Sequence, residues 1–307
     1  MASGTVFTVT SPEPVEGQPV PNSTVHVLGS HLEPGRTTTS GPATRSVAVD
    51  PTRKRLYTVN GVGGLSMLDA TSLQTLATAQ FDLHLLDVAV DPAAGLVYVS
   101  QWSIPGGKVH VLRADDLSVV ATVTESGGFH GPQGLAVDAD AQRVYVARDF
   151  RSGGPSGPVV TALSVIRRVP GGQHVIERTV PLGEPAVQPI DVAVDGPANL
   201  VFVAGLGSAQ VHPRLIVLDR STHVVLGHER IPGPARAVAA RPGTGLAYVV
   251  GEAGLTVVDG RTRTRELTLK LGRQPHAVAV DPDTGATYVG DRIDGTITRI
   301  DAMDGLG

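Results

Sequence analysis

The sequence contains no cysteine among its 307 residues. This absence excludes disulfide bonds, thiolate nucleophiles, and zinc or iron–sulfur sites that need cysteine ligands. Aromatic residues make up only 4% of the chain, too few for platforms that stack nucleic-acid bases. Acidic and basic residues are interspersed and the net charge is −4, so no basic stripe is available for a phosphate backbone. We therefore expect no nucleic-acid partner.

Long apolar runs are also missing. No stretch approaches the roughly 18 continuous apolar residues that a membrane-spanning helix requires. The first residues, Met1 to Phe7, show neither the basic region nor the long apolar region of a signal peptide. We expect a soluble, cytoplasmic protein with no membrane partner, or a secreted one if a leader has been trimmed. Hydrophobic residues (41%) and charged residues (18%) are balanced as in a chain with a packed core.

A repeated phrase is the most informative feature that is present. An alternating apolar strand ends at an aspartate turn and is followed by a Tyr-Val strand, as in Ser46–Pro51 with Leu56–Asn60 and in Ala277–Pro282 with Thr287–Val289. The aligned turn positions are residues 50, 91, 138, 195, 241 and 281, which lie 41, 47, 57, 46 and 40 residues apart. A period of about 40–45 residues with four short strands is typical of a β-propeller.

Each unit divides into four strands. The third alternates strictly, as in Leu215–Asp219, and the fourth is more polar, as in Arg263–Leu269. No segment sustains a 3.6-residue period, so we predict an all-β fold. Seven blades of about 43 residues fit the length, and six is the alternative. Residues 5–9, 24–28 and 36–40 supply strands of a further unit at the N-terminus. We expect a single β-propeller domain over 1–307, with N- and C-terminal strands closing the ring.

The repeat phrase resembles that of the YVTN-type β-propeller family over nearly the whole chain. Leu56-Tyr57-Thr58-Val59-Asn60 comes closest to the motif that gives the family its name. The other copies depart from it at the asparagine, where they carry Ser100, Ala147, Ala204, Val250 and Gly290. The resemblance implies the propeller fold and says little about activity, because fold and function separate freely in propellers.

Candidate functional residues follow from the expected fold. In a propeller, the loop leading into each first strand and the loop joining the second and third strands build one face beside the central channel, where ligands bind. The similarity of the repeat style to lyase and lactonase propellers would give the role of base to His276 or His130 and that of electrostatic stabiliser to Arg236. The acid or metal ligand would be Glu252, Asp149 or Asp291. The predicted ligand-binding residues are Arg45, Asn60, His84, Asp87, Trp102, Gln133, Asp149, Arg151, Asp191, Asp291 and Arg292. The alternative explanation for these residues is that the solvent-exposed loops of any propeller carry polar side chains.

Other acidic residues and histidines have a structural interpretation. The aspartates of the repeated turn suggest calcium, yet no twelve-residue loop of alternating acids is present. Aspartate at the start of a tight turn caps backbone N–H groups, so we interpret these residues as turn formers. His26 and His110 lie inside alternating strands and are interpreted as packing residues.

Three functions remain open from the sequence. The first is a propeller that binds a small molecule at the loop face of its channel. Such a protein could also catalyse a reaction of the lyase or cyclase type in secondary metabolism. The second is a metal-assisted enzyme, because the repeat style is similar to that of streptogramin lyases and calcium-dependent lactonases, which implies a divalent ion. The third is a non-catalytic scaffold that binds a protein partner. No metal ligand set can be named from the sequence.

Overall fold

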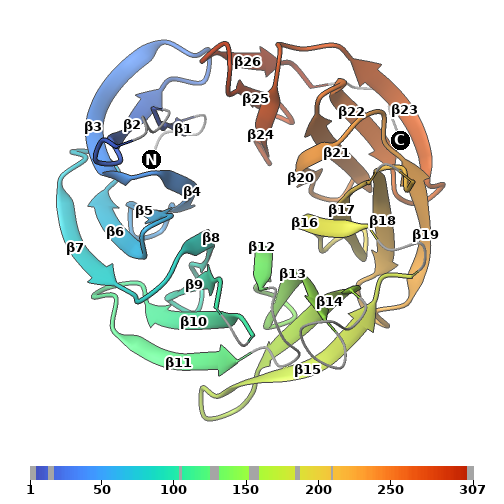
Figure 1. Cartoon of the computed structure of the whole chain (residues 1–307), viewed down its shortest axis with the longest axis horizontal. Coiled ribbons are helices and arrows are strands. Elements are labelled where there is room, and N and C mark those ends of the chain that lie inside the picture. The colour runs from blue at the N-terminus through green and yellow to red at the C-terminus, as the bar shows by residue number, and fades with distance from the viewer. Residues whose placement is uncertain are drawn as a thin grey trace. The chain divides into compact units, whose positions relative to one another are not determined.

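The computed structural model describes residues 5–12, 17–103, 106–124, 131–151, 159–183, 187–208 and 210–302. Every regular element in this part of the chain is a β-strand, and the strands form seven sheets. These sheets are the blades of a seven-bladed β-propeller, so the predicted all-β fold and the higher blade number are confirmed (Figure 1). The described residues include no helix with the length and apolar character needed to span a membrane.

Five blades have four strands that follow sequence order across the sheet. Blade 2 contains β4 (Thr44–Asp50), β5 (Arg55–Asn60), β6 (Gly64–Asp69) and β7 (Thr75–Gln80). Blade 3 contains β8 (Leu85–Asp91), β9 (Leu96–Gln101), β10 (Lys108–Arg113) and β11 (Val119–Thr124). Blade 4 contains β12 (Pro132–Asp138), β13 (Arg143–Arg151), β14 (Val159–Arg168) and β15 (His174–Pro181). Blade 5 contains β16 (Gln188–Asp195), β17 (Leu200–Leu206), β18 (Arg214–Asp219) and β19 (Val225–Arg230). Blade 6 contains β20 (Ala235–Arg241), β21 (Leu246–Gly251), β22 (Gly254–Asp259) and β23 (Thr264–Leu269).

The first and last blades have three strands each among the described residues. Blade 1 contains β1 (Val6–Thr10), β2 (Asn22–Leu28) and β3 (Pro34–Pro42), and blade 7 contains β24 (Pro275–Val280), β25 (Thr287–Asp291) and β26 (Ile297–Ile300). The three N-terminal strands match those predicted. However, β1 pairs with β2 inside its own sheet, and no described N-terminal strand joins blade 7. The expected completion of the C-terminal sheet is therefore not made by β1.

The chain divides into two compact units. Unit 1 comprises Met1–Gln142, Phe150–Gly157 and Arg167–Val175, and unit 2 comprises Arg143–Asp149, Pro158–Ile166 and Ile176–Gly307. In unit 1, side chains from blades 2 and 3, among them Tyr57 and Leu85, form one core cluster. In unit 2, Phe202 and Val249 belong to a cluster between blades 5 and 6. That residues 1–307 form a single domain therefore stays a prediction.

The repeated aspartate closes the turn after the first strand, as predicted. Asp50 Oδ1 accepts a hydrogen bond from the Arg53 backbone N–H at 3.0 Å, which is the bond that shapes a turn begun by aspartate. The same bond from a carboxylate to a nearby backbone N–H occurs at Asp91, Asp138, Asp195 and Asp281. These bonds confirm the interpretation of these residues as turn formers.

Candidate functional site

A β-bulge recurs at the start of the first strand of the blades. Where the first strand pairs with the second, the register skips one residue, and the skipped residue has no partner in the ladder. The skipped residues are Arg45, Leu86, Ile190, Arg236 and His276. Bulges occur preferentially beside functional sites because they redirect one side chain. Three predicted site residues, Arg45, Arg236 and His276, therefore occupy equivalent positions in different blades.

Two of the predicted residues contact each other in unit 2, and two more interact electrostatically with this pair. Arg236 Nη2 lies 3.5 Å from Glu252 Oε1, and both side chains are partly exposed. Arg236 Nε is buried and has no hydrogen-bond partner among the described residues. The charges of Arg292 and Arg236 reach His276, since both act on its ionisation. This group (Arg236, Glu252, His276 and Arg292) is called the arginine–histidine cluster below.

The arginine–histidine cluster favours the neutral form of its imidazole. The pKa of His276 is lowered from its ordinary value of 6.5, first by desolvation and then by the positive charges of Arg292 and Arg236. A histidine with a lowered pKa is neutral at pH 7 and has a free lone pair for a hydrogen bond or a proton. The two arginines are permanently charged. The cluster therefore combines fixed cations with one neutral base.

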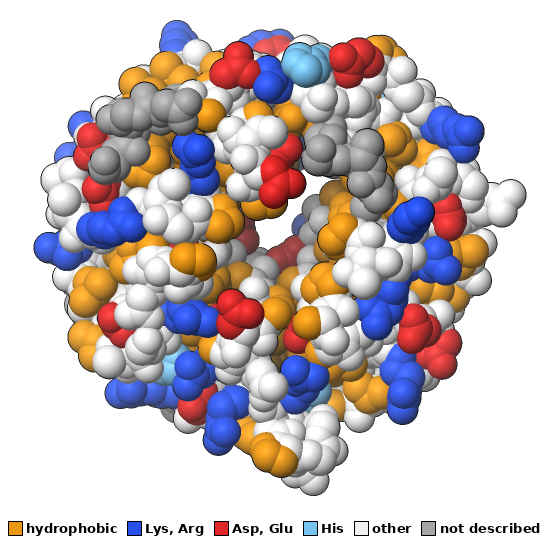
Figure 2. Space-filling view, turned by 180° about the vertical axis from the view of Figure 1, so that it is seen from behind, with side chains coloured by type: hydrophobic (Ala, Val, Ile, Leu, Met, Phe, Trp, Pro, Cys, Tyr) orange, Lys and Arg blue, Asp and Glu red, His pale blue; other side chains and the backbone are white. Residues whose placement is uncertain are grey.

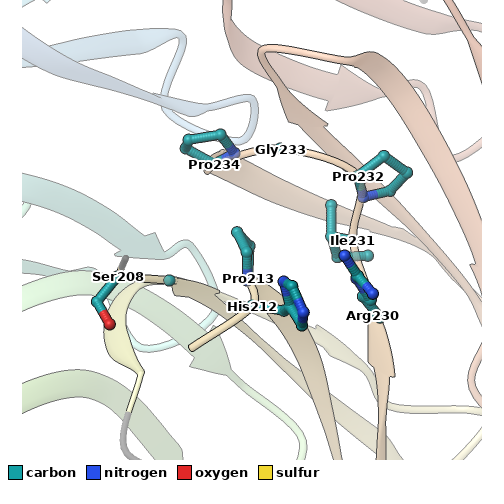
Figure 3. A pocket seen from close by; sticks show the side chains of 9 residues that line it. Ser208, His212, Pro213, Arg230, Ile231, Pro232, Gly233 and Pro234 are labelled. Carbon is teal, nitrogen blue, oxygen red and sulfur yellow. The ribbon is translucent and has the colours of Figure 1, made fainter. Parts of the chain in front are cut away.

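A pocket of about 490 Å³ opens beside this cluster in unit 2 (Figure 3). Its walls come from the loop between β17 and β18, with Ser208, His212 and Pro213, and from residues 230–234 at the end of β19 and in the loop before β20. These are the two kinds of loop that the sequence predicted to build the ligand face. The prolines that line the pocket were not among the predicted residues, because proline in a loop carries no chemical motif.

Four predicted ligand-binding residues hold the backbone instead. Asn60 Oδ1 accepts hydrogen bonds from Val62 N (3.1 Å) and Gly64 N (2.7 Å). Asp291 accepts three, from Gln274 N, Ile293 N and Asp294 N. Desolvation raises the Asp291 pKa, but these backbone bonds outweigh it and leave the pKa lowered. The remaining two, Asp87 and Asp191, bond to neighbouring first strands.

Asp87 links three first strands in unit 1. Its Oδ1 accepts from Ser46 Oγ of β4 at 2.5 Å and from its neighbour Val88 N at 2.9 Å, while Oδ2 accepts from Leu135 N of β12 at 2.7 Å. Desolvation nevertheless raises the pKa of Asp87. Asp191 makes the equivalent bond in unit 2, to Val238 N of β20 at 2.8 Å. These carboxylates hold adjacent blades together.

The predicted residues of unit 1 form a looser group. The rings of His84 and Trp102 lie 6.2 Å apart, and His84 Nδ1 contacts the Gly61 carbonyl oxygen. Arg45 is exposed, and Gln133 is half-buried with its carbonyl oxygen accepting from Ser100 Oγ at 3.0 Å.

The remaining predicted residues contribute less to a site. Asp149 is buried in β13. His130 and the Arg151 side chain lie outside what the structure describes.

No group of three or more histidine, aspartate or glutamate side chains in the described ranges is arranged to hold a metal ion. The donor set of the arginine–histidine cluster also fits a metal poorly, because two guanidinium groups repel a cation.

On the face shown in Figure 2, basic and acidic side chains are interspersed, and no band of one sign stands out. The absence of a nucleic-acid partner stays a prediction.

The comparisons with known proteins concern the fold. No family model matches the chain, and no curated protein matches it. Among solved structures, the chain is similar to Kuenenia stuttgartiensis hydrazine synthase, with a TM-score of 0.75 and 14% sequence identity. The match covers 92% of this chain and 90% of that one. At this identity the likeness shows the propeller fold alone.

Proposed function

We propose that the protein binds a small anionic molecule, through a carboxylate or phosphate group, at the arginine–histidine cluster. The observation that carries the proposal is the buried, unpartnered Nε of Arg236. A buried donor without a partner costs about 1–3 kcal/mol, and a ligand oxygen removes that cost. Arginine presents Nε and Nη as a fork that matches two carboxylate or phosphate oxygens.

The neighbouring side chains support binding of an anion. Glu252 is half-exposed and its 3.5 Å contact with Arg236 is long for a charge-assisted hydrogen bond. It can therefore move away when a ligand oxygen takes its place. Arg292 is exposed and adds a second positive charge. The neutral imidazole of His276 can accept a hydrogen bond from a hydroxyl or amino group of the ligand.

Catalysis at the same place is the second candidate function, favoured by the lowered pKa of His276. A neutral imidazole held near two cations can remove a proton from a bound substrate while the arginines stabilise the negative charge that develops. That is the chemistry of a metal-free lyase or cyclase. The repeat phrase further supports assigning the chain to the YVTN-type repeats, an assignment that concerns fold rather than activity.

Calorimetric titration with acetate and with inorganic phosphate tests the binding proposal. We expect saturable binding that weakens at least tenfold in Arg236→Gln, because charge-assisted hydrogen bonds contribute about 1.5–3 kcal/mol. Arg113→Gln, at an exposed position in blade 3, is the matched control and should bind as the parent protein does. Equal affinity in parent and Arg236→Gln, or no binding of either anion, would contradict the proposal and leave the scaffold function.

A further inference from the structure

Part of the wall of the pocket in Figure 3 is rigid and apolar. Three prolines line it, Pro213 from the loop between β17 and β18 and Pro232 and Pro234 from the loop between β19 and β20, and Ile231 directly precedes Pro232. Proline rings have almost no side-chain freedom to lose when a ligand packs against them. A surface that is already ordered binds more tightly than one that must become ordered.

The polar side chains that line the pocket are exposed to solvent. His212, Arg230 and Ser208 are exposed side chains on the lining, whereas Ile231 is buried. An apolar wall with a few polar groups is the usual composition of a small-molecule site, and its volume of about 490 Å³ falls within the roughly 300–1,000 Å³ of such sites.

The pocket and the arginine–histidine cluster share a loop, because the loop between β19 and β20 lines the pocket and leads to Arg236. The Pro234 carbonyl oxygen accepts a hydrogen bond from Glu252 N at 3.3 Å. A Cβ atom built on Gly233, which lines the pocket, would lie 3.6 Å from the Glu252 Cβ. Glu252 in turn contacts Arg236, which follows Pro234 by two residues. One wall of the pocket therefore contacts the acid that contacts Arg236.

We infer that the pocket receives the apolar ring of the ligand whose anionic group Arg236 binds, so that the ligand is an aryl-substituted carboxylate. The inference rests on the proposed function and names its ligand class. The C–H groups of a pyrrolidine ring pack against the face of an aromatic ring, and a single aromatic ring fits the available volume. A ligand of this kind places its apolar part against the prolines and its charge on the guanidinium.

A series of probes that differ only in the apolar part tests this inference. Acetate, phenylacetate, 3-phenylpropionate and 4-phenylbutyrate carry the same carboxylate, with a ring at increasing distance. We expect at least one aryl probe to bind about tenfold more tightly than acetate, in line with partial burial of one ring. Aryl probes that bind no better than acetate, while acetate binding still depends on Arg236, would overturn the ligand class and leave the proposed function standing.

A pocket-filling variant locates the ring. Ser208→Phe places an aromatic side chain on the pocket wall from an exposed loop position, and Ser221→Phe places one in the exposed turn after β18 as the matched control. We expect Ser208→Phe to abolish the gain of the aryl probes over acetate without changing acetate binding, and Ser221→Phe to leave both intact. A gain that persists in Ser208→Phe would overturn the placement. Loss of all anion binding in the parent protein would instead defeat the proposed function.

Discussion

The Tyr57 hydroxyl of blade 2 donates a hydrogen bond of 2.7 Å to the Ala114 carbonyl oxygen of blade 3. Tyr145 of blade 4 makes the corresponding contact with the Arg220 carbonyl oxygen of blade 5, at 3.3 Å. Both tyrosines come from the repeated Tyr-Val strand, and both acceptors lie in the turn after the third strand of the following blade. The sequence repeat therefore carries a contact between blades as well as a strand.

Removing the Tyr57 hydroxyl should weaken this contact. Tyr57 is fully buried, and desolvation raises its pKa to about 12, so it remains a donor throughout the neutral range. We expect Tyr57→Phe to lower the free energy of unfolding by about 1–2 kcal/mol. Tyr145→Phe, which removes a longer bond, should cost less. Urea unfolding of the two variants measures both values, and a larger loss in Tyr145→Phe would contradict the assignment.

Asp87 should contribute more than an ordinary turn aspartate. Asp87→Ala leaves the backbone N–H groups of Val88 and Leu135 without their acceptor, and both residues are buried. We expect a loss of about 3 kcal/mol in the free energy of unfolding. Asp116→Ala removes an exposed aspartate that bonds only locally to Ser118, and should cost less than about 1 kcal/mol. Similar losses in the two variants would show that Asp87 does not hold blades together.

His110 should make stability depend on pH. It is buried against Phe81 between Gln101 Oε1 and Thr122 Oγ1, and desolvation lowers its pKa to about 4. Between about pH 4 and pH 6.5 the unfolded chain binds more protons than the folded one, so the stabilisation is complete above pH 6.5 and is lost as the pH falls.

The measurement compares urea unfolding at pH 7 and pH 4.5 in the parent protein and in His110→Gln. The parent should lose roughly 2 kcal/mol more than the variant over this interval. The other histidines are common to both proteins and cancel in the difference. Equal losses would mean that His110 is protonated in the folded state at pH 4.5.

Gly260 should tolerate no side chain beside Phe202. A Cβ atom at residue 260 would lie 2.5 Å from Phe202 Cε1, closer than real Cβ contacts allow. We expect Gly260→Ala to cost about 1–3 kcal/mol through overpacking. Phe202→Leu should relieve the shortest part of the clash and leave a contact of 2.9 Å with Leu200 Cδ1, so that the double variant loses less than the sum of the two single changes. Additive losses in a thermal or urea unfolding cycle would exclude a direct clash.

The sequence predicted the blades well because their strands repeat. The N-terminal strand expected at 24–28 lies within β2, and the alternating strand at Leu215–Asp219 lies within β18. Periodicity reports which face of a strand is buried, and that information is local. Pairing between strands from the two ends of the chain is not local, so periodicity could not predict which sheet the N-terminal strand joins.

The candidate site was only partly accessible from the sequence. Arg236, Glu252, His276 and Arg292 could be grouped because the repeat assigns them to the two kinds of loop that build the same face. The bulge that frees Arg236 and His276 from the ladder depends on a one-residue difference in pairing, which periodicity does not resolve. The prolines of the pocket could not be predicted, because they contribute shape to the site and no chemical group that a motif would mark. Asn60 and Asp291 were grouped with ligand residues because a polar side chain in a loop looks the same whether it bonds to a ligand or to the backbone.

The recurring bulge has a consequence for how such a chain can acquire new activities. At the same place in successive repeats the chain carries guanidinium at Arg45, alkyl groups at Leu86 and Ile190, and imidazole at His276. Because the ladder does not use this residue, one copy can mutate while its neighbours and the strand pairing stay as they were. A gene built by duplicating one repeat would thus hold a set of independently variable positions, and selection could assemble a site from them one substitution at a time.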